Sequence, residues 1–338
     1  MSDPGPRVLA VTNMYPTAAD PGYGAFVAVQ MESVVRLGAA VAVQFIDGRA
    51  GASRYAAAVG RIRRLARSDR FDLVHAHYGL SGFAAGFQPL PLVVSFCGDD
   101  LLGTPARRGG ITPKSACVRW LSRRAARRAD AIICKSDELR DALPHPTDRA
   151  RAHVIANGVD TDRFTPGDRG DARRRLGLDL GERLVLFPHT PDVPRKRFDL
   201  AEAALKVMAR EGLHLRLWAV SGVPHAQMPD YYRAADCLLL TSDQEGSPNV
   251  VKEALCCDVP VVSVDVGDVR RWLDRAPGCC LVERDPVAIA AGLRQVVCGR
   301  GRVDGSTVRG EVSTDRVAAQ VLAVYREAIA RRRMSAGV

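Results

Sequence analysis

Short, uninterrupted apolar runs alternate with helix-like segments along almost the whole chain, and this alternation most strongly constrains its fold. A continuous apolar run of roughly four to eight residues is typical of a strand that is buried on both faces. Helices between such strands provide the crossover connections that a parallel sheet requires. The sequence therefore predicts an α/β fold of parallel sheets covered by helices on both faces.

The first series of expected elements lies within residues 1–165 and includes a glycine- and proline-rich loop at 15–24. Strands are expected at 8–12, 41–46, 73–77, 92–96, 131–134 and 153–155, and helices at 25–37, 55–66, 113–128 and 137–143.

A polar, turn-rich break at 166–171 precedes a second series of the same kind. Strands are expected at 183–187, 213–220, 237–241, 259–264 and 279–282, and helices at 172–176, 198–211, 231–234, 249–256, 269–273 and 286–298. We expect a long connection at 299–313 and a last helix at 315–333. This pattern predicts two doubly wound, Rossmann-like domains that face a cleft, with ligands bound beyond the carboxyl ends of the strands.

Composition excludes several classes of protein. With 338 residues, 47% hydrophobic and 25% charged, the chain is neither disordered nor fibrous. No apolar run approaches the ~20 residues of a membrane-spanning helix, and the first residues lack a secretory signal pattern, so we expect a cytoplasmic protein. Nine cysteines without metal-site spacing predict reduced, mostly buried thiols and no bound metal.

The positive charge is concentrated in the first half, where residues 1–165 carry 22 Lys and Arg against 15 Asp and Glu. Within the basic segments 61–70 and 107–128, Arg119, Arg123 and Arg127 recur at helical spacing and are expected on one face. Such a face suits an anionic membrane, and hence a peripheral location at its inner surface, or an acidic substrate; a solvated helix face is the other interpretation. Nucleic acid is not expected, because no aromatic residues interleave the basic run.

The segment 241–255 carries the clearest chemical pattern. A strand ends, a Gly-Ser-Pro-Asn turn follows, and a helix opens between Glu245 and Glu253. The amides at such a helix start favour an anion such as a diphosphate, and Glu253, two turns away from Glu245, suits vicinal hydroxyls. The alternative is that Glu245 only caps the helix and Glu253 is solvated.

Four segments resemble the family-4 glycosyltransferases of the GT-B fold, in order and in spacing. They are Glu245-x7-Glu253, 157–160 followed by Phe164, 196–200, and 72–82. Segments 95–103 and 245–253 are similar to the branch of teichuronic-acid and other surface-polysaccharide glycosyltransferases. The resemblance implies metal-independent transfer of a sugar from a nucleoside diphosphate, with retention of anomeric configuration and no further cofactor.

The resemblance also implies a division of labour. Residues 1–165 would form the acceptor domain and 166–312 the donor domain, while the helix in 313–338 would pack back on the first domain. UDP-sugars are the first choice of donor and GDP-sugars the second. The acceptor would be a hydroxyl of a lipid-linked polysaccharide intermediate or of a secondary metabolite.

In the donor domain the resemblance assigns a role to each matching residue. Lys196 would stabilise the leaving diphosphate, Glu245 would contact the transferred sugar, and Glu253 would hold the ribose. The remaining donor contacts of this domain are expected from Thr190, Arg195, Val223, Ser247 and the amides of Asn249 and Val250. Gly24, in the loop after the first strand of the other domain, would let the backbone approach the donor diphosphate and the acceptor.

In the first domain, strand ends would face the acceptor or the sugar through His77, Tyr78, Asp99 and Asp100. His75 is expected on the opposite strand face from His77, in the core.

Three positions depart from the family pattern. Thr190 stands where an arginine is usual, so either Arg195 or Arg197 replaces it or the phosphate site is weaker. Cys97 replaces a histidine near the sugar, unless His77 or His189 takes over that role. Pro248 lacks the N–H that the family offers to the sugar.

The retaining reaction is expected to proceed by front-face attack with the departing phosphate as base. A double displacement would instead need Asp99 or Asp100 as nucleophile. Two alternatives remain open: a nucleotide-sugar epimerase of the same fold, and a degenerate relative that only binds. A nicotinamide-dependent dehydrogenase is not favoured, because no G-x-G-x-x-G follows the first strand.

Overall fold

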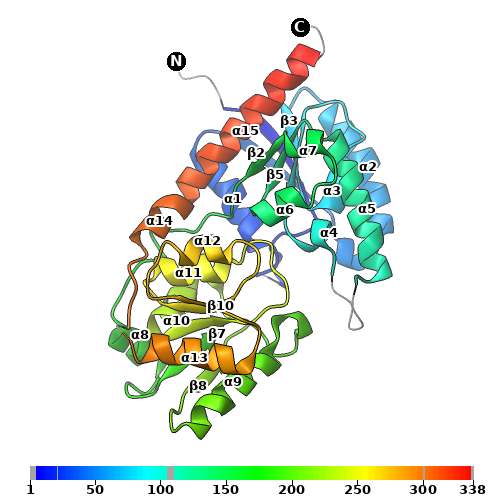
Figure 1. The fold of residues 1–338 in the computed structure, drawn as a ribbon. Coiled ribbons are helices and arrows are strands. Elements are labelled where there is room, and N and C mark those ends of the chain that lie inside the picture. Colours follow the sequence, from blue (N-terminus) through cyan, green and yellow to red (C-terminus); the bar gives the residue numbers. More distant parts are fainter. Residues whose placement is uncertain (1–4, 21, 105–109, 300, 336–338) are drawn as a thin grey trace. The chain divides into compact units, whose positions relative to one another are not determined.

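The computed structural model describes residues 5–20, 22–104, 110–299 and 301–335, which belong to two compact units (Figure 1). Unit 1 combines Met1–Gly158 with Thr314–Val338, and unit 2 is the intervening Val159–Ser313. The chain enters and leaves unit 2 at neighbouring positions, because the Val159 amide donates to the Val312 carbonyl at 2.7 Å.

Unit 1 is built on a six-stranded parallel sheet with the order β2-β1-β3-β4-β5-β6. Its strands are β1 (Arg7–Thr12), β2 (Ala40–Phe45), β3 (Leu73–His77), β4 (Leu92–Phe96), β5 (Ala131–Cys134) and β6 (Ala152–Val154). Every residue of β3, β4 and β5 is buried, which is why these strands have continuous apolar runs instead of alternating ones.

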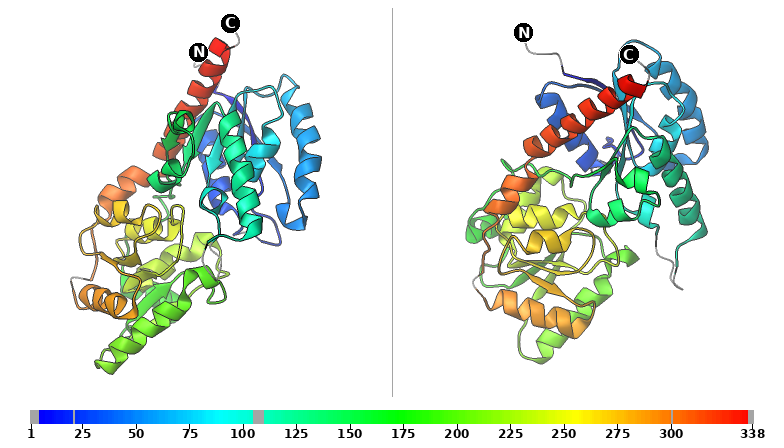
Figure 2. Two further views of the ribbon diagram at one scale, coloured as in Figure 1. Left: turned by 45° about the vertical axis from the view of Figure 1, so that its right-hand side comes forward. Right: turned by 45° about the horizontal axis from the view of Figure 1, so that its top comes forward.

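Helices cover both faces of this sheet (Figure 2). Successive strand side chains point to opposite faces and enter different cores. Leu9 and Val11 pack on the face covered by α2 (Ser53–Ala66), α3 (Gly79–Ala85) and α5 (Pro113–Arg128). Val8 and Ala10 pack on the other face, against α1 (Ala25–Arg36) and α15 (Thr314–Ser335). Shorter helices follow the strands at α4 (Asp99–Leu102), α6 (Asp137–Asp141) and α7 (Pro146–Arg149), with a 3-10 turn, η1, at Gly48–Ala50.

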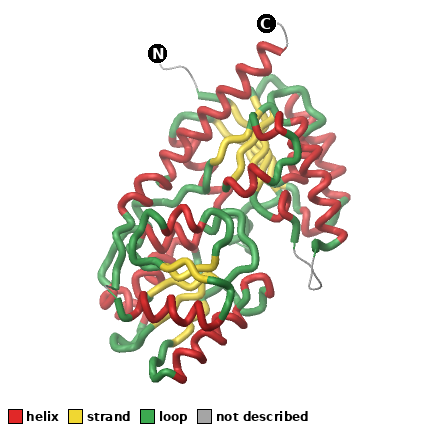
Figure 3. The backbone as a smooth tube through the Cα atoms, viewed as in Figure 1, coloured by secondary structure: helices red, strands yellow, loops and turns green. Residues whose placement is uncertain are grey.

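Unit 2 is built on a five-stranded parallel sheet with the order β11-β10-β9-β7-β8 (Figure 3). Its strands are β7 (Leu184–Phe187), β8 (Arg216–Ala219), β9 (Cys237–Leu240), β10 (Val261–Val264) and β11 (Cys280–Val282). The core of one face is formed with α9 (Phe198–Arg210) and α13 (Pro286–Val297). The remaining helices are α8 (Arg169–Leu176), α10 (Met228–Ala234), α11 (Asn249–Cys256), α12 (Val269–Leu273) and α14 (Ser306–Val312).

The predicted fold class, two doubly wound α/β units with parallel sheets, is confirmed. Helices α11 and α12 have the predicted bounds. The prediction of an unbroken connection at 299–313 is wrong, because α14 lies within it and Arg309 donates from it to the Cys256 carbonyl at 3.0 Å. Helices α3, α4 and α7 were not predicted, since they are too short, or too rich in glycine and serine, for a periodic apolar pattern.

A buried hydrogen-bonded chain anchors α15 to the sheet of unit 1. The Tyr325 hydroxyl lies 2.6 Å from His75 Nδ1, and His75 Nε2 lies 2.8 Å from Ser95 Oγ. Complete burial lowers the pKa of His75 well below its ordinary value, so the ring is neutral. Each ring nitrogen therefore has its hydrogen-bond partner inside the core.

Replacing Tyr325 with Phe removes one of these partners and leaves His75 Nδ1 buried without one. We expect Tyr325→Phe to lower the free energy of unfolding by about 1–3 kcal/mol, measured by thermal unfolding. Tyr15→Phe is the matched control, since no hydrogen bond of the Tyr15 hydroxyl occurs within the described residues. Equal stability of both variants would contradict the anchoring role of Tyr325.

Candidate functional site

The candidate site of unit 2 lies at the carboxyl ends of β7 and β9, where the strand order reverses. In the order β9-β7-β8 the chain leaves β7 for β8 on one side, while β9 lies on the other. Loops that diverge in this way leave a crevice in which open α/β sheets bind ligands. His189 and Thr190 follow β7, and Thr241 follows β9, so these residues are at the reversal.

A buried ion pair joins the two loops at this reversal. Lys196 ends the 3-10 turn η2 (Pro194–Lys196), and its Nζ donates to Glu245 Oε1 at 2.5 Å. The two side chains are only 7% and 12% exposed. Arg195 Nη1 adds a contact of 3.5 Å to Glu245 Oε2 from a half-exposed position.

Hydrogen bonds from the loop after β9 to backbone carbonyls hold the segment of Lys196 in place. The buried Thr241 hydroxyl lies 2.8 Å from the Lys196 carbonyl and 3.0 Å from the Arg197 carbonyl. The Asp243 amide donates to the Arg195 carbonyl at 2.8 Å. The predicted residues Lys196, Arg195 and Glu245 are therefore brought together by main-chain contacts as well as by their charges.

In this cluster, burial and the neighbouring charges have opposite effects on the pKa values of Glu245 and Lys196. Burial disfavours ionisation of Glu245, but the Lys196 and Arg195 charges outweigh it and lower the pKa of the carboxyl below its ordinary value. Burial also lowers the pKa of Lys196, and Glu245 opposes that shift. A carboxylate and an ammonium group thus stand side by side in a largely water-excluded place.

Helix α11 begins directly after this cluster, so its first-turn amides lie at the same edge of the sheet. Asn249 and Val250 are its first two residues, and amides in a first turn precede the helical hydrogen-bond ladder. Pro248, which has no N–H, is the residue before the helix. The helix start adds partial positive charge next to Lys196 and Arg195.

Glu253, one turn further along α11, accepts hydrogen bonds on both carboxylate oxygens. Tyr232 Oη donates to Oε2 at 2.6 Å, and His225 Nε2 lies 2.9 Å from Oε1. His225 starts the 3-10 turn η3 (His225–Gln227), so Val223, two residues earlier, belongs to the loop between β8 and the histidine that contacts Glu253. Neither partner of Glu253 was predicted, because no spacing links residues 28 and 21 positions away.

The position expected for an arginine has no positive charge. The Thr190 hydroxyl donates to Asp192 Oδ2 at 3.2 Å. Arg197 is engaged with Asp199 and Asp243, which leaves Arg195 as the arginine that contacts Glu245. His189 precedes Thr190 in the same loop. Burial, and to a smaller extent the charge of Lys196, lower the pKa of His189 to about 3.

Two of the predicted site residues, one in each unit, also have structural roles. In this conformation the Ser247 hydroxyl is hydrogen-bonded to Asp268 and Lys252. In unit 1, Gly24 has φ +71°, and a Cβ there would lie 2.3 Å from the Met14 carbonyl carbon. Glycine at this position is required by its own backbone packing.

The expected opposite placement of His75 and His77 is wrong. Residues two apart on a strand share a face, and the two rings lie 4.1 Å apart. His77 is fully buried, and its Nε2 lies 3.0 Å from Gln30 Oε1. Burial lowers the pKa of His77 to about 3, so a neutral ring is enclosed in the core in this conformation.

The other strand-end residues of unit 1 divide into one buried and one exposed carboxylate. Asp100 is fully buried and accepts the amides of Gly79, Cys97 and Gly98 at 3.0, 3.1 and 2.9 Å. Burial raises its pKa to about 7. Asp99 is exposed at the first position of α4, directly after the Cys97–Gly98 turn whose amides donate to Asp100.

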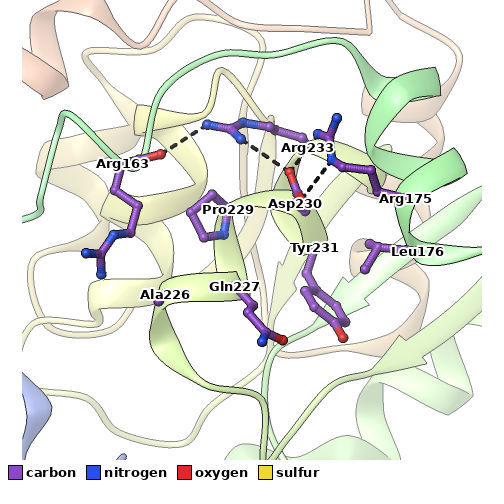
Figure 4. A pocket seen from close by; sticks show the side chains of 9 residues that line it. All are labelled: Arg163, Arg175, Leu176, Ala226, Gln227, Pro229, Asp230, Tyr231 and Arg233. Carbon is purple, nitrogen blue, oxygen red and sulfur yellow. Dashed lines mark hydrogen bonds and ion pairs between the residues drawn. The ribbon is translucent and has the colours of Figure 1, made fainter.

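Unit 2 also contains an open cavity of about 320 Å³ away from the predicted residues (Figure 4). Arg175 contacts both Asp230 oxygens at 2.9 and 2.8 Å, and Arg233 contacts the same carboxylate at 3.3 Å. These arginines are therefore already paired. Within the described residues, no cluster of three or more His, Cys, Asp or Glu is suited to a metal ion, and no helix is long and apolar enough to cross a bilayer.

Two family descriptions match the chain, one in each unit. "Glycosyltransferase Family 4" matches residues 5–163, and "Glycosyl transferases group 1" matches residues 195–298.

Among curated proteins, the chain is similar to two D-inositol 3-phosphate glycosyltransferases. The protein of Geodermatophilus obscurus is 30% identical over 314 residues, covering 80% of this chain and 70% of the relative. That of Xylanimonas cellulosilytica is 28% identical over 305 residues, covering 78% and 73%.

Among solved structures, sucrose-phosphate synthase from Thermosynechococcus elongatus superimposes with a TM-score of 0.78 at 18% identity, covering 96% of this chain and 99% of that one. Anabaena Alr3699/HepE in complex with UDP gives 0.69 at 16% identity, covering 95% and 99%. At these identities the likeness shows the fold alone.

The His225–Glu253 contact predicts a pH-dependent stability. The hydrogen bond to Glu253 raises the pKa of His225, so its stabilisation is complete below about pH 6.5 and is lost as the pH rises through the folded-state pKa. We expect His225→Gln to lower Tm by about 2–4 °C at about pH 5.5 and by less at about pH 8.5. His214→Gln, at an exposed histidine of the same unit, is the control; a gap independent of pH would contradict the pairing.

Proposed function

We propose a specific reaction for this chain, which belongs to the family-4 glycosyltransferases and has their GT-B fold class. It transfers a sugar from a nucleoside diphosphate sugar to a hydroxyl acceptor with retention of configuration. Unit 2 binds the donor and unit 1 contributes acceptor contacts. UDP is the first choice of nucleotide and GDP the second.

The observation that carries this proposal is the Lys196–Glu245 pair beside the start of α11. Lys196, Arg195 and the first-turn amides place positive charge where the diphosphate leaves. Glu245 accepts from sugar hydroxyls, and Glu253 accepts from the ribose hydroxyls with its remaining lone pairs. The loop of Val223 contacts the base.

In the proposed step, the acceptor oxygen bonds to the anomeric carbon as the bond from that carbon to the phosphate oxygen breaks. The acceptor proton passes to the departing phosphate, so no enzymic nucleophile and no metal is required. Asp100 is occupied by three amides, which disfavours it as a nucleophile. Asp99 remains the carboxylate that contacts the acceptor or sugar.

The acceptor proposal includes three hydroxyl compounds. Lipid-linked polysaccharide intermediates and secondary metabolites follow from the family resemblance. The names of the curated relatives add a phosphorylated polyol, D-inositol 3-phosphate, as a third candidate to test.

The arginine-rich layer of unit 1 supports a contact with anionic membranes. Helices α2, α3 and α5 cover one face of the sheet and contain no acidic residue, but four basic residues in α2 and six in α5. Trp120 and Phe87 are 54% and 42% exposed, and Arg124 and Arg128 lie over their rings.

The predicted stripe on α5 is only partly available for such a contact. Arg127 is exposed, whereas Arg119 and Arg123 are partly buried. Arg107 and Arg108 of the basic run lie outside the described residues. We therefore assign the membrane contact to the exposed residues Trp120, Arg124 and Arg127, at about 1 kcal/mol per basic side chain.

Removing either member of the central ion pair tests the donor site. Glu245→Gln and Lys196→Ala should each lower sugar transfer by at least about a hundredfold, since one preorganised electrostatic contact is lost. Calorimetry with UDP, GDP, ADP and dTDP identifies the donor for the assay. The control variants are Glu202→Gln and Lys206→Ala, exposed residues of the same types on α9. Unchanged transfer in the test variants would refute the site.

Vesicle flotation tests the membrane contact. The wild-type protein should float with phosphatidylglycerol vesicles at low salt, and a Trp120→Ser, Arg124→Glu, Arg127→Glu variant should bind about tenfold more weakly or worse. Lys206→Glu with Arg210→Glu, exposed on α9, controls for net charge. An equal loss of vesicle binding in both variants would show that this surface is only a solvated helix face.

A further inference from the structure

A lysine with no assigned role is fully buried in α11, next to Glu253. Lys252 has no exposed surface, and its Nζ donates to Ser247 Oγ at 2.8 Å. Ser247 lies in the turn 245–249 that connects Glu245 to the start of α11. The buried ammonium group therefore reaches back along its own helix to the turn of the candidate site.

The same serine connects the lysine to a carboxylate from the neighbouring loop. Ser247 Oγ donates to Asp268 Oδ2 at 2.7 Å, and Trp272 Nε1 donates to the same oxygen at 2.7 Å. Asp268 precedes α12 in the loop after β10. An ammonium group only donates and a carboxylate only accepts, so the direction of the serine hydroxyl is fixed.

The two loops are also in close backbone contact. Gly267 has φ +58°, and a Cβ there would lie 2.8 Å from the Gly246 carbonyl oxygen and 3.0 Å from that of Glu245. No side chain fits between them. The Lys252–Ser247–Asp268 bridge therefore fastens the 245–249 turn to a second turn that lies directly against it.

Stability alone gives no reason for this arrangement. Removing an ammonium and a carboxylate from water is costly even when the two are paired, and apolar residues of similar volume often serve as well. Buried polar bridges instead fix one geometry among several. The geometry fixed here is that of the turn whose amides and Glu245 belong to the proposed donor site.

We infer that Lys252 and Asp268 are positioning residues that hold the 245–249 turn, through the Ser247 hydroxyl, in the conformation that receives the donor diphosphate. This inference rests on the proposed function. Lys252 acts on the turn from the interior of the protein and does not touch the substrate. Its loss weakens diphosphate binding because the turn becomes mobile, while the fold of unit 2 persists.

Ser247→Ala is the sharpest test, because it removes only the bridging hydroxyl and keeps both charged residues. Binding of UDP, and of GDP in parallel, is measured by calorimetry well below Tm. We expect the Kd to rise about tenfold in Ser247→Ala and at least as much in Lys252→Met, and Ser247→Thr to restore binding. Ser263→Ala is the matched control, since Ser263 is a fully buried serine of the same unit whose hydroxyl donates to the Val264 carbonyl at 2.8 Å.

The outcomes separate the inference from its premise. If the wild type binds a nucleotide and Ser247→Ala binds it within twofold, the positioning role is overturned while the donor site stands. A loss of affinity in Ser263→Ala equal to that in Ser247→Ala would also overturn it, as a general effect of a lost buried hydroxyl. If the wild type binds neither UDP nor GDP, the proposed donor falls and the inference with it.

Discussion

The reversal of strand order between β7 and β9 is the constraint on which the chemistry of unit 2 depends. All strands of this sheet are parallel, so their carboxyl ends lie along one edge, and the loops diverge only where the order reverses. The loop after β7 brings Lys196, and the loop after β9 brings Glu245. The Thr241 hydroxyl and the Asp243 amide then join the two loops by hydrogen bonds to the carbonyls of Lys196 and Arg195, next to the paired charges.

Around the start of α11, two buried lysines and one partly exposed histidine are each matched by a carboxylate. Lys196 contacts Glu245, Lys252 reaches Asp268 through a serine, and His225 lies beside Glu253. These contacts order the side chains before any ligand arrives, which reduces the reorganisation that binding requires. In the proposed donor complex, a phosphate would have to compete with Glu245 for Lys196, so the proposal requires both its negative charge and its hydrogen bonds to the helix start.

The sequence predicts what depends on local pattern. Continuous apolar runs identified the buried strands, and the Gly-Ser-Pro-Asn turn located α11, with Glu245 and Glu253 correctly placed about it. Contacts between distant segments could not be predicted from local pattern. No sequence pattern identifies Tyr232 and His225 as partners of Glu253, or Asp268 as the partner of Ser247. Lys252 interrupts an apolar helix face and was the one local signal of the bridge. The misplacement of His75 relative to His77 came from applying strand alternation to residues two apart, which share a face.

The return of α15 to unit 1 has a consequence for the order in which the protein is made. Val317, Val321, Leu322 and Tyr325 cover a sheet face that includes Val8 and Leu73, although more than two thirds of the chain is synthesised between these segments. On the ribosome, unit 2 is a contiguous segment and can fold as soon as it emerges, whereas unit 1 keeps an apolar face open until residues beyond 313 appear. The first unit to be translated is thus the last to be completed, and a chain truncated before α15 exposes that face to aggregation.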